Sequence, residues 1–180
     1  MPKIVAFACE HSAYEAAAAA AALGQKTGET MPMEATVPGE NPGFQVGRVG
    51  GVEIVKVPCT GRVEVIDILK ALEGGADGVI VLGCFEEACH YLTGNVRAKK
   101  RVGYVRRLIR DIGIEEDRIQ FFHLAPDMDA RFSRIIEEFS RQVENMGPGP
   151  ATGITVTGIG TGAREQGLAT GEQAQAARAR

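Results

Sequence analysis

The chemistry available to this chain of 180 residues lies mainly in its four cysteines, which follow one pattern. Cys9, Cys59 and Cys84 each end a short apolar run, and Cys89 follows five residues after Cys84. The runs span residues 3–8, 52–58 and 78–83. Short apolar runs predict buried strands, and parallel strands end at one edge of a sheet, where ligands bind. We therefore expect the four thiols to converge, as the ligands of a metal ion or an iron–sulfur cluster must.

The residues around the cysteines favour ligation. A segment with helical character follows each strand, with Cys89 expected in the first turn of the third helix, and helix N-termini stabilise thiolates. Gly61 and Gly83 leave room for the backbone to approach a bound group, and Pro58 fixes the turn before Cys59. Zinc sites commonly use two tight cysteine pairs. The long separations between ligands here therefore favour an iron–sulfur cluster.

Other interpretations of the cysteines stay open. Free cysteines are among the most buried residue types, so some of the four can simply fill the core. A structural zinc ion would make the chain a docking module of a larger complex. Cys84 and Cys89 can also act as a dithiol switch that needs no metal.

The histidines lie near the cysteines but have less specific signals. His90 either hydrogen-bonds a cluster sulfur or caps the turn after Cys89, and His11 is a candidate substitute ligand. His123 is expected to be structural. The sequence has no Ser/His/Asp order and no paired-carboxylate spacing that would indicate hydrolysis, so we expect a non-catalytic subunit.

Composition sets the class of protein. The chain is 44% hydrophobic and 24% charged, which suits one domain with a proper core. A net charge of -3 gives no case for nucleic acid or an anionic membrane as partner. Since no apolar run approaches the roughly 20 residues of a membrane span, we expect no membrane insertion. The N-terminus enters a strand without a signal peptide, so the expected location is cytoplasmic.

Alternating strand and helix patterns predict an α/β fold. Helical stretches are expected at residues 11–23, 61–73, 96–112 and 127–145, and a fourth strand at 118–124. In the third of these helices, Leu108 and Ile112 are among the residues expected to face inward. Four βα units in a row predict a mostly parallel sheet with helices on both faces, either flavodoxin-like or Rossmann-like.

Two segments stand apart from this pattern, and together they set the predicted domain organisation. Residues 24–51, rich in Gly and Pro, are interpreted as a surface excursion within an α/β iron–sulfur domain of residues 1–146. Residues 147–180 contain no aromatic residue and are rich in Gly, Ala and Thr. They are expected to form an extended tail bound to a partner.

With these residues in hand, the chain resembles the delta subunit family of methyl-viologen-reducing hydrogenase. The resemblance covers residues 3–147 apart from the excursion. The matching pieces are IVAFACE (4–10), VPCTGR (57–62), GGADGVIVLG (74–83), CFEEACHY (84–91), GN (94–95), the basic helix expected at 96–112 and GIEEDR (113–118).

The resemblance implies a small electron carrier with a 2Fe–2S cluster, for which Cys9, Cys59, Cys84 and Cys89 are the candidate ligands. It implies two partners: the donor is a hydrogenase or formate dehydrogenase subunit, and the acceptor is a heterodisulfide-reductase-like FAD subunit. Family members often have a second cysteine three positions after the first, where this chain has Ser12. Ser12 is therefore expected near the cluster without being a ligand. His11 stands where the family often has an aromatic residue.

Overall fold

The computed structural model describes residues 1–23, 31–36, 44–49 and 51–150. Its described strands form one sheet in the order β2-β3-β4-β1-β5-β6. The strands are β1 (Ile4–Cys9), β2 (Met31–Thr36), β3 (Gln45–Val49), β4 (Val52–Val57), β5 (Gly78–Gly83) and β6 (Ile119–His123). The pairs β1–β4, β1–β5 and β5–β6 are parallel, whereas β2–β3 and β3–β4 are antiparallel. The sheet is thus mostly parallel, as predicted.

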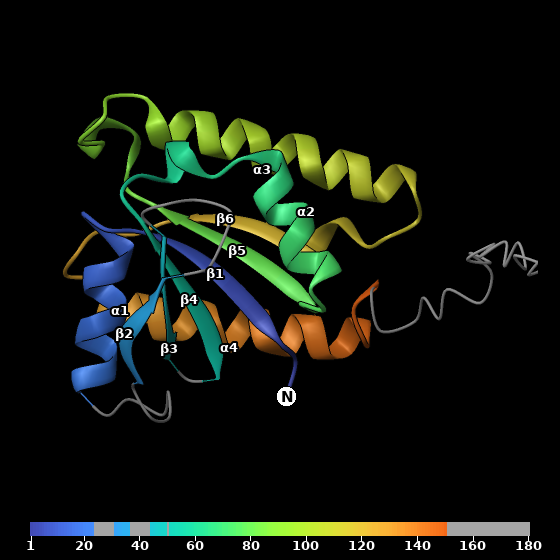
Figure 1. Ribbon diagram of the computed structural model, residues 1–180, viewed down its shortest axis with the longest axis horizontal. Coiled ribbons are helices and arrows are strands. Elements are labelled where there is room, and N and C mark those ends of the chain that lie inside the picture. The colour runs from blue at the N-terminus through green and yellow to red at the C-terminus, as the bar shows by residue number, and fades with distance from the viewer. Residues whose placement is uncertain (24–30, 37–43, 50, 151–180) are drawn as a thin grey trace, which may run out of the picture.

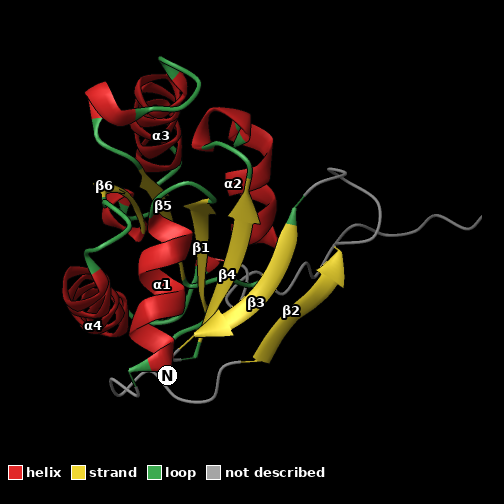
Figure 2. Ribbon diagram, turned by 90° about the vertical axis from the view of Figure 1, so that its left-hand side faces the viewer, coloured by secondary structure: helices red, strands yellow, loops and turns green. Residues whose placement is uncertain are grey.

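The helices of the described residues cover the two faces of the sheet (Figures 1 and 2). They are α1 (Ala13–Ala22), α2 (Val65–Glu73), α3 (Gly94–Asp111) and α4 (Asp129–Met146), with short 3₁₀ turns η1 (Thr60–Arg62), η2 (Glu86–Ala88) and η3 (Glu116–Arg118). Helices α1 and α4 pack on the even-numbered residues of β1, such as Ile4 and Ala6. Helices α2 and α3 pack on the odd-numbered ones, Val5 and Phe7. Because side chains alternate along a strand, the fully apolar β1 supplies both cores, which confirms the predicted α/β architecture.

The prediction of a surface excursion over residues 24–51 is wrong for the part of this range that the structure describes, because two strands there extend the sheet. Strand β3 pairs with β4 from Gln45–Lys56 to Val49–Val52, and β2 pairs with β3. Ladder hydrogen bonds come from the backbone, so an edge strand needs no strong apolar pattern of its own. These two strands were not predicted because the surrounding residues are rich in Gly and Pro, which are typical of loops.

Two further expectations are corrected around α3. Cys89 lies between η2 and α3, five residues before the helix begins, rather than in its first turn. Leu108 and Ile112, expected to face inward, are exposed, whereas Val102, Val105 and Ile109 of the same helix are buried. A helix that packs on a sheet on one side only buries a narrow stripe, and these two residues lie at its margin.

The strand order places the cysteines at a point where the chain reverses direction across the sheet. From β1 the chain runs to β4 on one side, and from β4 it crosses to β5 on the other side of β1. Ligands bind at such switch points, outside the carboxyl ends of the strands. Cys9 is the last residue of β1, Cys59 follows β4, and Cys84 follows β5. All three strands therefore deliver a cysteine to this one place.

The opposite edge of the sheet is closed by polar contacts. The buried Arg118 donates to the carbonyl oxygens of Asp77 and of Met146, Gly147 and Pro148, and to the carboxylate of Glu115. It thereby ties the end of α4 to the start of β5 and β6. The predicted tail of residues 147–180 begins here, and residues 151–180 lie outside the described ones.

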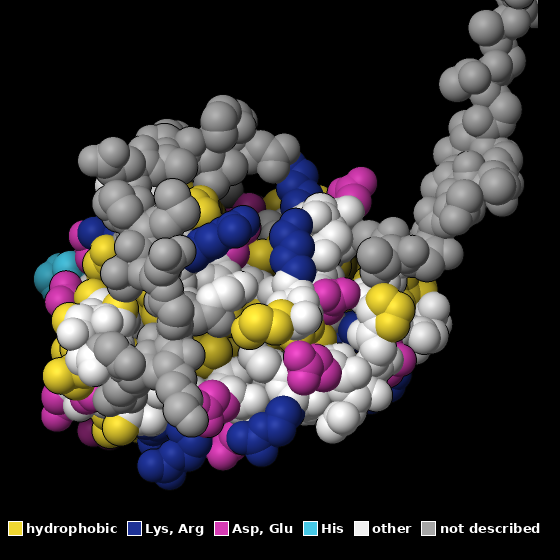
Figure 3. All heavy atoms as spheres, turned by 90° about the horizontal axis from the view of Figure 1, so that it is seen from below, with side chains coloured by type: hydrophobic (Ala, Val, Ile, Leu, Met, Phe, Trp, Pro, Cys, Tyr) yellow, Lys and Arg dark blue, Asp and Glu magenta, His cyan; other side chains and the backbone are white. Residues whose placement is uncertain are grey.

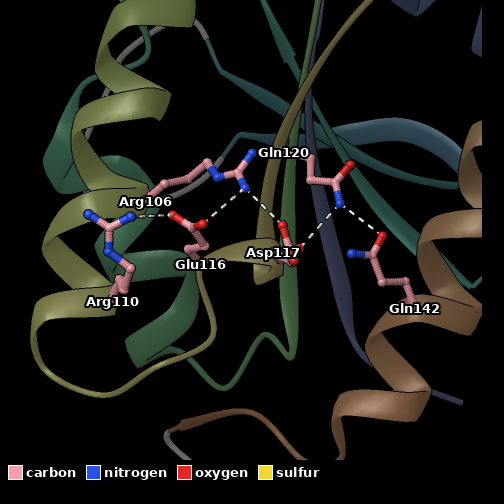
Figure 4. A network of polar contacts seen from close by, with 6 residues as sticks. All are labelled: Arg106, Arg110, Glu116, Asp117, Gln120 and Gln142. Atoms are coloured by element: carbon pink, nitrogen blue, oxygen red, sulfur yellow. Dashed lines mark hydrogen bonds and ion pairs between the residues drawn. The ribbon is translucent and has the colours of Figure 1, made fainter.

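Further polar contacts link the helices to this end of the sheet (Figure 4). Arg106 and Arg110 of α3 pair with Glu116 of η3, and Arg106 also pairs with Asp117. Gln120 of β6 donates to Gln142 of α4 at 2.8 Å. Both layers of helices are therefore anchored to β6 and the turn before it.

The surface and the helices match the composition. Basic and acidic side chains are interspersed over the face seen in Figure 3, without a field of one sign. None of the helices in the described part of the chain has the length and apolar character that crossing a membrane requires.

Candidate metal centre

The four thiols are all buried and free of disulfide bonds. Cys59, Cys84 and Cys89 contact one another in a small cluster of their own. Cys9 lies at the end of β1, between the strands that carry Cys59 and Cys84, and acts electrostatically on both of those thiols. The structure therefore brings three of the four predicted thiols into contact, with Cys9 at the end of the neighbouring strand.

Cys89 forms hydrogen bonds with both Cys59 and Cys84, and its surroundings favour the thiolate form of its side chain. Burial opposes its charge, but backbone N–H groups of Asn95, Tyr91 and Gly94 and the thiol of Cys84 donate hydrogen bonds to its sulfur. Together these donors lower the pKa of Cys89 below its ordinary value. The amides belong to the turn before α3 and to its first residues, where backbone N–H groups have no partner within the helix. Although Cys89 lies before α3 and not in its first turn, the backbone N–H groups at the start of the helix still stabilise its thiolate, as was predicted for the first turn.

Cys59 and Cys84 have the opposite tendency. Burial raises the pKa of Cys59 to about 11, against a hydrogen bond from the backbone N–H of Gly61 at 3.4 Å. Burial, together with the charges of Cys9 and Cys89, raises the pKa of Cys84 to about 12. Both thiols also donate to Cys89. Among these three thiols, Cys89 is therefore the one whose ionised form the surroundings favour.

Glycines permit the close approach of η1 and α3 at this site. A Cβ at position 94 would overlap Cys59 Sγ and lie 3.5 Å from Cys89 Sγ, and a Cβ at Gly61 would lie 2.7 Å from Gly94 Cα. Arg101 of α3 holds the same turn by donating to the carbonyl oxygens of Gly61 and Val63 at 2.7 and 2.9 Å. Gly61 was expected to allow backbone near a bound group; in the structure it allows two backbones to meet beside Cys59.

Asn95 and His123 position the segment that carries Cys84. The buried amide of Asn95 donates to the carbonyl oxygens of Cys84 at 3.0 Å and Phe85 at 2.6 Å. The Nδ1 atom of His123 lies 2.9 Å from the carbonyl oxygen of Cys84, and its ring stacks on Phe85. The expectation that His123 is structural agrees with this contact. From the sequence, Asn95 was named only as part of the GN match to the family, and no role was predicted for it.

His11 and His90 meet although they come from different turns. Their rings stack with centroids 4.6 Å apart, and Tyr91 lies edge-on to His90 with centroids 5.0 Å apart. Both histidines and Tyr91 are exposed. The stack covers the turns that follow Cys9 and Cys89, and its role as a source of hydrogen bonds to a cluster or as a substitute ligand stays a prediction.

Two hydroxyl groups complete the surroundings of the thiols. Ser12 and Thr60 are buried, and neither hydroxyl has a hydrogen-bond partner among the described residues. Gly83, expected to allow close approach to a bound group, instead accommodates its neighbours. A Cβ there would lie 2.7 Å from the ring of Phe121 and 3.3 Å from Thr60 Oγ1. Sequence reasoning named Ser12 and Gly83 but missed Thr60.

A pocket of about 290 Å³ opens beside the cluster. Cys59 lies in its wall, with Gly61 and Gly94, where η1 and α3 meet. The exposed side chains of Arg62, Arg97 and Tyr91 line the pocket as well. No acidic residue is among the described residues that line it, so the approach to Cys59 is positively charged.

The thiols as they stand do not make a finished metal site. Within the described ranges, no three His, Cys, Asp or Glu side chains form a group that could hold a metal ion. What the site does offer is a set of four sulfur donors, amides aimed at one of them, and backbone space at Gly94. These features fit a sulfur-ligated group, whose binding would replace the hydrogen bonds between the thiols.

Comparison with known proteins shows which family and which relatives the chain is similar to. The family model described as methyl-viologen-reducing hydrogenase, delta subunit, matches residues 46–147. The iron-sulfur subunit of the F420-non-reducing hydrogenase of Archaeoglobus profundus is 33% identical over 147 residues, covering 82% of this chain and 92% of that protein. The iron-sulfur subunit of the vhu F420-non-reducing hydrogenase of Methanocaldococcus jannaschii is 37% identical over 99 residues, which are 55% of this chain and 74% of that protein.

A similar segment also occurs inside a larger protein. This is one of the subunits of the ferredoxin/F420H2-dependent CoB-CoM heterodisulfide reductase of Methanosarcina acetivorans, which is 38% identical over 97 residues, or 54% of this chain. They are 12% of that protein, so the chain spans a small part of its length. In the family match, Cys59, Cys84 and Cys89 fall inside the matched residues, and Cys9 lies before them.

Proposed function

The chain belongs to the methyl-viologen-reducing hydrogenase delta subunit family, and from this premise we propose that it is an electron-transfer subunit carrying a 2Fe–2S cluster. It relays electrons from a hydrogenase or formate dehydrogenase module to a heterodisulfide-reductase-like FAD subunit. The observation that carries the proposal is the contact between Cys59, Cys84 and Cys89, with Cys9 on the neighbouring strand end. Four cysteine thiolates are the ligand set of such clusters.

The relatives support both halves of this proposal. Proteins that cover most of the chain are named as iron-sulfur subunits of hydrogenases. A similar segment forms part of a subunit of a heterodisulfide reductase. A domain that occurs alone beside a hydrogenase and fused within a reductase subunit suits a carrier between the two.

The protein's own contribution is to hold the four sulfurs and to balance their charge. When bound, the cluster supplies one-electron redox chemistry. The amides of Asn95, Tyr91 and Gly94 stabilise negative charge on Cys89. Cys59 and Cys84 must lose their protons for ligation, so binding releases protons and is favoured by higher pH. Burial of the four cysteines limits the access of water to the sulfurs.

Electrons most directly pass through the pocket side of the site. Cys59 is the cysteine that lines the pocket, and Arg62 and Arg97 flank it. A redox partner with an acidic surface would be attracted to this side and brought close to the Cys59 sulfur. We propose a relay role without substrate turnover.

The proposal is tested by purifying the full chain without oxygen. Iron, acid-labile sulfide and zinc are measured together with the electron paramagnetic resonance (EPR) spectrum after reduction. About two irons and two sulfides per chain with a reduced 2Fe–2S signal are expected. The variants Cys59→Ala and Cys84→Ala should lose the signal and the electron transfer, while the other subunits still assemble. Electron transfer that continues in either variant overturns the proposal.

One alternative has a specific observation in its favour. The lowered pKa of Cys89 and its hydrogen bond from Cys84 also suit a dithiol that forms a disulfide. A protein free of iron whose Cys84 and Cys89 cycle between thiol and disulfide would support that function. Zinc without an EPR signal would instead indicate a docking subunit.

A further inference from the structure

Two buried hydroxyls without partners lie in the cysteine turns. In the described part of the chain, Ser12 Oγ and Thr60 Oγ1 are the buried side-chain oxygen or nitrogen atoms that lack a hydrogen bond. They are 1% and 0% exposed. A buried hydroxyl without a partner destabilises the fold, and proteins satisfy nearly all such groups. That both follow a cysteine, at positions 12 and 60, indicates that the missing acceptor belongs to the cysteine site.

The Thr60 hydroxyl lies beside the segments that carry Cys59 and Cys84. Thr60 directly follows Cys59 and begins η1, yet its Oγ1 would be 3.3 Å from a Cβ on Gly83, the residue before Cys84. Strand β1 runs between β4 and β5. Turn η1, which begins at Thr60, contacts both β5 and β1, the strand that ends at Cys9.

The Ser12 hydroxyl does not cap helix α1, although its position would allow it to do so. Ser12 is the residue before α1, where a serine normally accepts a hydrogen bond from the first turn of the helix. Here its side chain makes no such cap. Its backbone N–H instead donates to the carbonyl oxygen of Cys9 at 3.2 Å, which fixes Ser12 in the turn after that cysteine.

We propose that the Thr60 and Ser12 hydroxyls donate hydrogen bonds to sulfur atoms of the iron–sulfur site and raise its reduction potential. The inference rests on the proposed function, since it needs the cluster to be present. Reduction adds negative charge to the sulfurs, so a donor stabilises the reduced form more than the oxidised form. Sulfur provides the acceptor that both hydroxyls lack in the protein alone.

The test uses the full chain with its cluster, in the variants Thr60→Val and Ser12→Ala. Thr60→Val keeps the shape of the side chain and removes the hydroxyl. The control is Ser133→Ala, which removes a hydroxyl that donates to Asp129 within α4. Midpoint potentials are measured by EPR-monitored titration, with iron and sulfide determined for each sample. Pulsed EPR in D₂O then detects exchangeable deuterons that couple to the reduced cluster.

Each hydroxyl removed should lower the ratio of reduced to oxidised protein about tenfold at the wild-type midpoint, equivalent to about 59 mV. Iron and sulfide should stay at the wild-type level, one deuteron coupling should disappear, and Thr60→Ser should restore both readouts. The Ser133→Ala variant should match the wild type.

Failure of this inference differs from failure of the proposed function. A wild-type cluster with unchanged potential and deuteron couplings in Thr60→Val and Ser12→Ala overturns only the inference. A wild-type chain without iron and sulfide overturns both. If Thr60→Val loses its iron, the potentials of Ser12→Ala and Thr60→Ser are used to test the inference. A wild-type potential in Ser12→Ala then contradicts it.

Discussion

The side-chain amide of Asn95 donates a hydrogen bond to the carbonyl oxygen of Cys84 at 3.0 Å. This contact joins the first turn of α3 to the end of β5. The same amide nitrogen reaches the carbonyl oxygen of Phe85, and the backbone N–H of Asn95 donates to the Cys89 sulfur. One buried residue therefore positions two candidate ligands that come from different segments.

Replacing Asn95 should weaken both the fold and the cluster site. Asn95→Ala removes the side-chain donor to the Phe85 carbonyl oxygen and leaves the Cys84 carbonyl oxygen with only its His123 contact, so it should lower the free energy of unfolding by about 1–3 kcal/mol. Denaturant unfolding of the metal-free chain measures this loss, and iron per chain should fall as well. Asn145→Ala, at an exposed position of α4, is the matched control and should change neither value. Full iron content and stability in Asn95→Ala would contradict the positioning role.

Two glycines of α3 should respond in opposite ways to a methyl group. A Cβ at Gly94 would overlap Cys59 Sγ, so Gly94→Ala should lower iron binding and destabilise by about 1–3 kcal/mol. A Cβ at Gly103 would meet nothing within 4 Å. Gly103→Ala should therefore stabilise the helix by about 0.5–1 kcal/mol. Thermal unfolding and iron analysis distinguish the two, and equal behaviour would show that position 94 has no steric role at the thiols.

The stability of the metal-free chain should decrease in alkaline solution. Burial raises the pKa of Cys84 to about 12 from an ordinary 9.0. Above pH 9 the unfolded chain loses this proton while the folded chain keeps it. The free energy of unfolding therefore falls as pH rises, by up to about 1.4 kcal/mol per pH unit for one thiol. Cys59 contributes with the same sign, because burial raises its pKa as well.

Cys84→Ser tests this linkage, since a serine hydroxyl does not titrate in this range. Urea unfolding between about pH 9 and pH 10 should give a shallower decrease for this variant than for the wild type. Ser140→Ala on α4 should keep the wild-type slope. Parallel slopes for Cys84→Ser and the wild type would mean that the Cys84 thiol titrates normally.

Reversing the charge beside the pocket should slow electron transfer without altering the cluster. Arg62 and Arg97 line the pocket in which Cys59 lies. In Arg62→Glu/Arg97→Glu, the partner would meet repulsion, and its rate should fall about tenfold or more at low salt. The difference should shrink at high salt because ions screen these charges.

The matched control reverses two arginines on the other face of the molecule, in Arg131→Glu/Arg134→Glu on α4. Stopped-flow reduction by the redox partner should leave this variant at the wild-type rate. The EPR spectrum and the potential should be unchanged in both double variants. A pocket variant that still reacts at the wild-type rate would place the electron-transfer contact elsewhere.

The parallel strands and the positions of their cysteines were predictable because both depend on local patterns. Apolar runs record burial of β1, β4 and β5, and a cysteine at the end of each needs only the rule that parallel strands share an edge. Helices α2 and α4 were predictable from their apolar stripes for the same reason. Strand β3 was not, because its place in the sheet rests on backbone hydrogen bonds to β4.

The sequence by itself determined that three strand ends would deliver thiols to one edge of an α/β sheet. Only the tertiary structure decided which hydrogen bonds and steric contacts surround those thiols. The contacts of Asn95 with Cys84, of Gly94 with Cys59, and of Thr60 with Gly83 join residues whose proximity follows from strand order and helix docking. Periodicity records which residues are buried, but hydrogen bonds and steric fit across a site depend on how separate segments are placed in space.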